Sequence, residues 1–127
     1  MTTPSPLADL LAIELDDRVK GLPPGVAPFP LGAIGKQGWR VLDGDMPLPV
    51  ALLKDNTLAH NGEWMRRFLA AGGAKIAPHG KTTMSPQLFR RQIDDGAWAI
   101  TVANAQQAQV ARYYGFQRII LANQLVG

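Results

Sequence analysis

The chain has 127 residues, 46% of them hydrophobic and 18% charged, which is typical of a soluble globular protein. Its net charge of +3 comes without a basic stripe interleaved with aromatic residues, so we predict no nucleic-acid partner. It has no cysteine and only two histidines, which argues against disulfides, thiolate catalysis and a metal site. We find no signal peptide and no apolar stretch long enough for a bilayer, and we therefore expect a cytoplasmic protein with no membrane partner.

We expect residues 1–48 to form a separate region, an N-terminal arm with a short helix. Apolar side chains from Leu10 to Val19 favour a short helix over residues 6–20. A Gly-Leu-Pro-Pro-Gly run ends it, and the segment up to Pro30 is typical of an extended arm or loop. Trp39, Val41 and Leu42 are candidates for local packing.

From Pro49 onward the pattern alternates between strands and helices. Four short apolar runs are typical of buried strands: 50–53, 75–77, 97–102 and 118–122. Three helices are expected between them: one begins at Asn56 or Thr57 and ends at Gly72-Gly73, one follows a Ser85 cap, and one covers 105–114 after an Asn104 cap.

This alternation predicts the fold class. Strands that begin 21 to 25 residues apart, with a helix between each pair, are typical of βαβ units on a parallel sheet. A (β/α)₈ barrel needs about 250 residues. We therefore expect residues 49–127 to be the N-terminal half of such a barrel, about four β/α units, and the chain to be one piece of a longer product. An open four-stranded sheet is the alternative, although no helix pattern follows the fourth run.

The segment Ala77-Pro78-His79-Gly80-Lys81-Thr82-Thr83 carries the candidate chemistry. It lies where the second predicted strand ends, and ligands of parallel α/β folds bind beyond the carboxyl ends of the strands. Alternation along a strand predicts that His79 and Lys81 share one face. A nucleotide phosphate loop is the alternative for the Gly-Lys-Thr triplet, but that motif needs a glycine where this chain has Lys75.

The same segment resembles the D-threonine aldolase and D-serine dehydratase family. Members have a Pro-His-x-Lys-Thr motif followed by a helix and a strand similar to 98–103, and residues 120–127 also resemble that family. The variant Ala-Pro-His-Gly-Lys-Thr-Thr-Met, with Lys-Gly-Leu-Pro at 20–23, resembles the amino-acid deaminase branch. The resemblance covers roughly residues 47–127. It departs at Ala77 and Met84, where relatives often have Arg and Lys, so the substrate stays open.

The resemblance implies an alanine-racemase-like N-terminal barrel that binds pyridoxal 5′-phosphate (PLP), with Lys81 forming the Schiff base. It implies a homodimeric full-length lyase or deaminase that acts on small hydroxy amino acids, of D configuration. His79, Thr101, Asn123 and Gln124 are further candidates for the cofactor site. His79 is equally suited to a polar barrel layer, and Asn123 or Gln124 to helix capping. A non-catalytic PLP-binding protein and an inactive truncated product are the alternatives.

Overall fold

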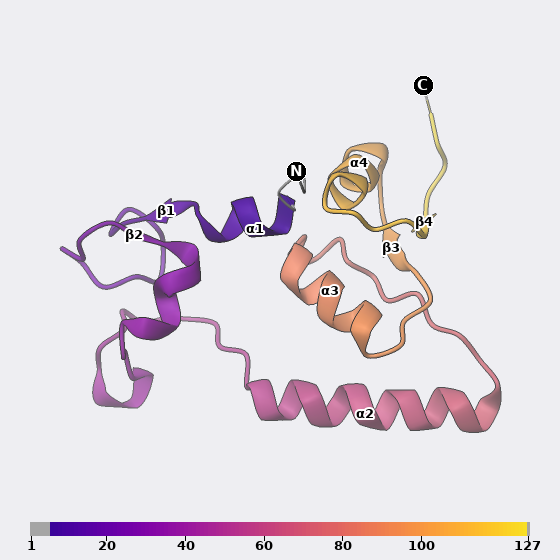
Figure 1. The fold of residues 1–127 in the computed structure, drawn as a ribbon, viewed down its shortest axis with the longest axis horizontal. Coiled ribbons are helices and arrows are strands. Elements are labelled where there is room, and N and C mark those ends of the chain that lie inside the picture. Colours follow the sequence, from indigo (N-terminus) through magenta and orange to yellow (C-terminus); the bar gives the residue numbers. More distant parts are fainter. Residues whose placement is uncertain (1–5, 127) are drawn as a thin grey trace, which may run out of the picture. The chain divides into compact units, whose positions relative to one another are not determined.

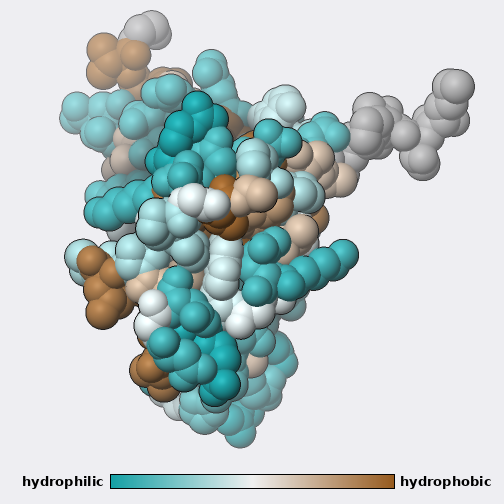
Figure 2. All heavy atoms as spheres, turned by 90° about the vertical axis from the view of Figure 1, so that its left-hand side faces the viewer, coloured by the Kyte–Doolittle hydropathy of each residue, from teal (hydrophilic) through white to brown (hydrophobic). Residues whose placement is uncertain are grey.

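The computed structural model describes residues 6–126 and shows a mixed α/β protein (Figure 1). The chain divides into two compact units, the first ending at Leu53 and the second beginning at Lys54. In the described part of the chain, no helix is both long and apolar enough to cross a membrane. On the face drawn in Figure 2, hydrophobic side chains form small separate groups between hydrophilic ones.

The first unit contains short elements. They are α1 (Pro6–Leu11), β1 (Glu14–Leu15), β2 (Phe29–Pro30) and two 3₁₀ helices, η1 (Leu31–Lys36) and η2 (Val41–Asp43). The prediction of a helix over 6–20 is wrong beyond Leu11. The chain there turns into β1, which pairs antiparallel with β2, and the Leu31 N–H donates to the Ile13 carbonyl at 2.8 Å. Pairing with a distant segment thus replaces the helix that the local pattern favours.

The local packing predicted around Trp39 and Leu42 in the first unit is only partly confirmed. The rings of Phe29 and Trp39 meet edge to face with centroids 5.7 Å apart, so Trp39 does pack locally. Leu42 is 99% exposed, and the prediction that it packs is wrong.

The strand predicted at 50–53 is absent from the structure. Leu52 and Leu53 lie in irregular backbone with more than half of their surface exposed. A short apolar run becomes a buried strand only where neighbouring strands supply hydrogen bonds and a second layer covers it. Among the described residues the run at 50–53 has no such neighbouring strand.

The second unit begins with the long helix α2 (Asp55–Gly72). Its N-cap is Lys54, two or three residues before the predicted caps, and this residue makes no capping bond with its side chain. It ends as predicted at Gly73, whose φ of +62° suits glycine. Ion pairs from Asp55 to Arg91 and from Arg66 to Asp95 join α2 to the next helix, which lies beside it in Figure 1.

The helices α3 (Pro86–Asp94) and α4 (Ala105–Tyr113) confirm the predicted caps. The Ser85 Oγ accepts the Leu88 N–H at 3.4 Å, and the Asn104 Oδ1 accepts the Gln107 N–H at 2.9 Å. These side chains satisfy amide groups that a helix leaves without partners in its first turn.

The strands β3 (Ile100–Val102) and β4 (Ile119–Leu121) pair in parallel across α4, as a βαβ unit requires. The segment 76–80 runs parallel to β3 on its other side. Hydrogen bonds of 2.7 to 2.8 Å join them: Trp98 N to Ile76 O, Thr101 N to Pro78 O, and Gly80 N to Thr101 O. The strand predicted to begin at 75–77 therefore does run beside β3, but only as an isolated bridge, His79 to Thr101. We refer to segment 76–80, β3 and β4 together as the parallel ladder.

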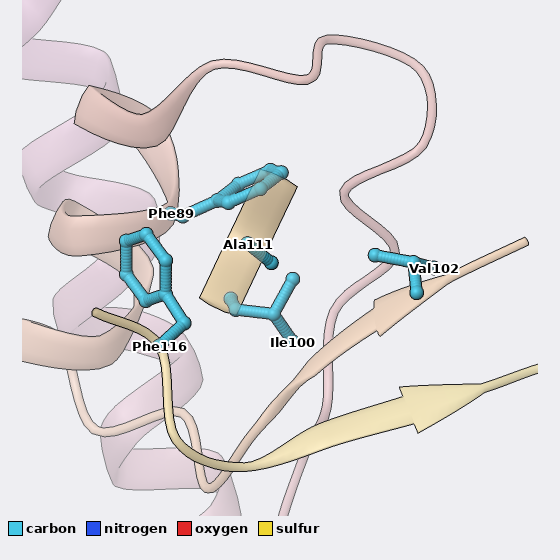
Figure 3. Packing of buried hydrophobic residues seen from close by; sticks show 5 residues of the cluster. All are labelled: Phe89, Ile100, Val102, Ala111 and Phe116. Atoms are coloured by element: carbon cyan, nitrogen blue, oxygen red, sulfur yellow. The ribbon is translucent and has the colours of Figure 1, made fainter. Parts of the chain in front are cut away.

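Helices α3 and α4 share the hydrophobic core with one face of the parallel ladder. Figure 3 shows the buried side chains of this core on the same side of β3 and β4: Phe89, Ile100, Val102, Ala111 and Phe116. The rings of Phe89 and Phe116 meet edge to face with centroids 5.5 Å apart. The helices therefore cover one face of the ladder, which fixes which side chains the opposite face presents.

Candidate functional site

Thr101 holds the lysine-bearing segment in place. Its backbone N–H donates to the Pro78 carbonyl at 2.8 Å, and its carbonyl accepts the Gly80 N–H at 2.7 Å. Its side-chain Oγ1 donates to the Ala77 carbonyl at 2.7 Å, and the residue is 8% exposed. Three hydrogen bonds from one residue of β3 thus fix the backbone that immediately precedes Lys81.

Gly80 allows that backbone to lie against the core. A Cβ added at Gly80 would lie 2.5 Å from the Cζ of Phe89 and 3.1 Å from the Cγ2 of Ile100. Phe89 is only 1% exposed and cannot swing away. Gly80 therefore faces the helices, and alternation turns its neighbour His79 toward the opposite face of the ladder. The sequence alone could not reveal this role, because the contact joins residues from two elements.

His79 and Thr101 are neighbours across the ladder. They form the bridge between segment 76–80 and β3, and Thr101 is paired in turn with Ile120 of β4. Residues paired in this way have their side chains on the same face. The face away from the helices thus carries a row of one imidazole, one hydroxyl and one aliphatic side chain. His79 and Ile120 are exposed.

Lys81 lies at the carboxyl end of the paired segment, with an exposed side chain. Among residues 6–126, the structure records no ion pair and no hydrogen bond of its ammonium group. Carboxyl ends of parallel strands meet at one edge of a sheet, so Lys81 lies at the edge where ligands of parallel α/β folds bind. The amine is sterically accessible to a small molecule there.

A tight turn follows Lys81 and leads into α3. The Met84 N–H donates to the Gly80 carbonyl at 2.9 Å, and Met84 has a φ of +44°, a left-handed conformation uncommon for a residue with a side chain. Its side chain packs on the core that contains Phe89, four residues into the helix, as in a hydrophobic staple. The Met84 side chain thus contributes to the packing of the core.

The same turn bears on the phosphate-loop alternative. In a phosphate loop, the Lys-Thr pair opens the helix whose N-terminus receives the phosphates. Here α3 begins at Pro86, so Lys81 and Thr82 lie in the turn before the helix. This arrangement disfavours a nucleotide phosphate loop.

Asn123 and Gln124 follow β4 at the same edge as Lys81. Both side chains are exposed, and the Asn123 Oδ1 accepts the N–H of Gln124 at 2.8 Å. This local bond stabilises the turn after the strand. The amide of Gln124 points to no partner that the structure records within residues 6–126.

The described residues include no group of three histidine, cysteine or acidic side chains that could hold a metal ion. No protein-family model matches the sequence, and no curated protein matches it either. The evidence for a function therefore comes from the residues of the site and from the motif around Lys81.

Proposed function

We propose that the parallel ladder and its helices are the early β/α units of a PLP-binding (β/α)₈ barrel. The support is the order of segment 76–80, β3 and β4, with α3 and α4 on one face of the ladder. In a barrel of this kind the helices lie outside, and the opposite face lines the interior. The row of His79, Thr101 and Ile120 would then belong to the interior.

We propose that Lys81 binds the cofactor, through a bond between its amine and the aldehyde of PLP. The observation that carries this proposal is the position of an accessible lysine at the carboxyl edge of a parallel ladder, on a backbone held by Thr101. A lysine at such an edge can act as a nucleophile toward a carbonyl group. When bound, PLP stabilises negative charge at the α-carbon of an amino acid.

The chain's own residues fit PLP in three respects. The turn after Gly80 leaves the Lys81 side chain exposed, and once displaced by substrate its Nζ could take up or deliver a proton. The imidazole of His79 is on a neighbouring exposed position, where it could orient the ring of a bound molecule. Asn123 and Gln124 supply neutral amides at the same edge and could contact polar groups of cofactor or substrate.

The reaction that we propose is that of a lyase or deaminase on small hydroxy amino acids of D configuration. The motif around Lys81 is its support. The non-catalytic alternative keeps the same lysine and cofactor but releases no product. The inactive alternative carries the lysine on an incomplete barrel.

Reductive labelling tests the attachment. The chain is mixed with PLP, reduced with borohydride, weighed intact and digested for peptide mapping. We expect one label per chain at Lys81, absent from Lys81→Ala. The matched control is Lys75→Ala, which removes another exposed lysine six residues earlier and should keep the label.

Equal labelling of Lys75 and Lys81 would contradict the proposal, because it would indicate an unselective reaction of exposed amines. Circular dichroism of each variant shows whether the fold is kept. Release of ammonia or aldehyde from D-serine or D-threonine, by a longer product that contains this sequence, separates the enzyme from the carrier. Specific labelling without product would favour the carrier.

A further inference from the structure

A second feature lies at the opposite edge of the parallel ladder from Lys81. A pocket of about 180 Å³ is enclosed by α3, by the residues that precede β3 and by the loop from α4 to β4. Its lining consists of two arginines, two aromatic residues and three others: Arg90, Arg118, Trp98, Phe116, Ile93, Gly115 and Gln117. This position is at the amino ends of the strands, so the pocket is separate from the proposed cofactor site.

Each arginine of the pocket lies over an aromatic ring. The Cζ of Arg90 is 5.1 Å from the centroid of Phe116, and the Cζ of Arg118 is 5.4 Å from that of Trp98. Both separations are within the range of a cation–π interaction. Within residues 6–126 the structure records ion pairs for other arginines but none for Arg90 or Arg118.

A cation–π contact leaves most of the hydrogen-bonding capacity of an arginine unused. A guanidinium that lies over a ring uses its positive charge for that contact, and its five N–H donors are still free to bind a ligand. The ring also restricts the side chain, so less entropy is lost when those donors bind a ligand. Two such side chains that line one pocket, with no recorded acidic partner, form an arrangement that favours an anion.

The remaining lining residues define what kind of anion fits. Gln117 is held in place because Arg112 Nη1 donates to its Oε1 at 3.1 Å, which adds a third guanidinium next to the pocket. Ile93 and Phe116 supply an apolar wall. A volume of about 180 Å³ is below the range of roughly 300–1,000 Å³ of pockets for drug-sized ligands.

We propose that this pocket is a binding site for a small oxyanion, a phosphate or a carboxylate, held by the guanidinium N–H groups of Arg90 and Arg118. Planar guanidinium groups match these anions with paired hydrogen bonds. Two charge-assisted contacts correspond to a dissociation constant of about 1 mM. This inference does not depend on the proposed PLP chemistry.

The test is an NMR titration of the 127-residue chain with inorganic phosphate, and separately with acetate, at constant ionic strength. The signals to follow are the Nε–H groups of Arg90 and Arg118 and the indole N–H of Trp98. We expect these to shift together and to saturate. Binding should be about tenfold weaker in Arg90→Gln and in Arg118→Gln, whose folding is checked by circular dichroism.

The matched control is Arg67→Gln, which removes the same charge from α2 and should leave the titration unchanged. The variant Arg118→Lys keeps the charge but loses the planar fork, and it should also bind more weakly. Saturation with phosphate alone would identify a dianion site, and saturation with both anions a general oxyanion site. Shifts that do not saturate, or that Arg67→Gln weakens as much as Arg118→Gln does, would overturn the proposal.

Discussion

The hydroxyl of Thr101 donates a 2.7 Å hydrogen bond to the carbonyl of Ala77, 24 residues earlier in the chain. The sequence suggested Thr101 as a contact for the cofactor. In the structure its hydroxyl donates to the backbone of the lysine-bearing segment. Because Thr101 also binds this segment through its own N–H and carbonyl, it determines where the backbone before Lys81 lies.

Replacing this hydroxyl should weaken the fold locally. Thr101→Val keeps the shape but removes the donor to Ala77, and we expect a loss of about 1 kcal/mol in the free energy of unfolding. Urea denaturation measures the loss, and hydrogen exchange at the Gly80 amide should become faster. The control is Thr82→Val at an exposed threonine, which should change stability by less than about 0.5 kcal/mol. Equal effects of both variants would show that the Thr101 bond contributes nothing.

Adding a methyl group at position 80 should be destabilising. In Gly80→Ala the new Cβ would collide with the buried ring of Phe89, and overpacking of this kind costs about 1 to 3 kcal/mol. Gly72→Ala is the matched control, since its added Cβ would meet no heavy atom within 4 Å apart from its chain neighbours and the backbone of its own helix, and it should be neutral or stabilising.

The double variant Gly80→Ala with Phe89→Leu tests the cause of that loss. If the collision is with the Phe89 ring, the double variant should lose less stability than the sum of the two single variants. Strict additivity would mean that Gly80 is needed for another reason.

We expect the 127-residue chain to self-associate through its ladder. In the described part of the chain β4 pairs only with β3, and its Ile120 is 40% exposed on the face away from the helices. An open strand edge next to exposed aliphatic surface templates further pairing. Sedimentation should show oligomers, which Ile120→Lys reduces. Gln106→Lys adds the same charge on an exposed position of α4 and should not reduce them. A monodisperse monomer of the unmodified chain would contradict this expectation.

One pH dependence follows from the first unit. The Arg18 side chain, and then its backbone N–H, donates to the Asp16 carboxylate and lowers the pKa of that carboxyl below its ordinary value. The folded pKa is the lower one, so the stabilisation is present above the ordinary pKa and is lost as the pH falls through the folded pKa. In an NMR titration, Arg18→Gln should raise the pKa of Asp16, and Arg40→Gln should not. An Asp16 midpoint that is the same in both variants would rule out the contact.

Local signals in the sequence predicted the second unit better than the first. Ser85 and Asn104 are caps whose partners lie three residues away, so the helices α3 and α4 could be located from the sequence alone. The helix expected up to residue 20 and the strand expected at 50–53 failed for another reason. Their outcome depends on distant neighbours: β2 pairs with β1, and no strand within residues 6–126 pairs with 50–53.

In the candidate site, too, the sequence predicted what depends on local signals and missed what depends on packing between elements. The position of Lys81 at the end of a parallel segment followed from the spacing of strands and helices. The contact of Gly80 with Phe89 did not, and neither did the meeting of Arg90 and Arg118 at one pocket. Such contacts depend on how elements pack, which the alternation of residue types does not specify.

The one-sided covering of β3 also protects against register errors. Ile100 and Val102 face the core while Thr101 faces away from it. A slip of β3 by one residue would turn the Thr101 hydroxyl toward the aromatic rings of the core and turn two aliphatic side chains away from them. It would also move the lysine-bearing segment by about 3.3 Å along the ladder relative to Asn123. The apolar residues on the core side of β3 thus set the alignment of Lys81 with Asn123 at the carboxyl edge of the ladder.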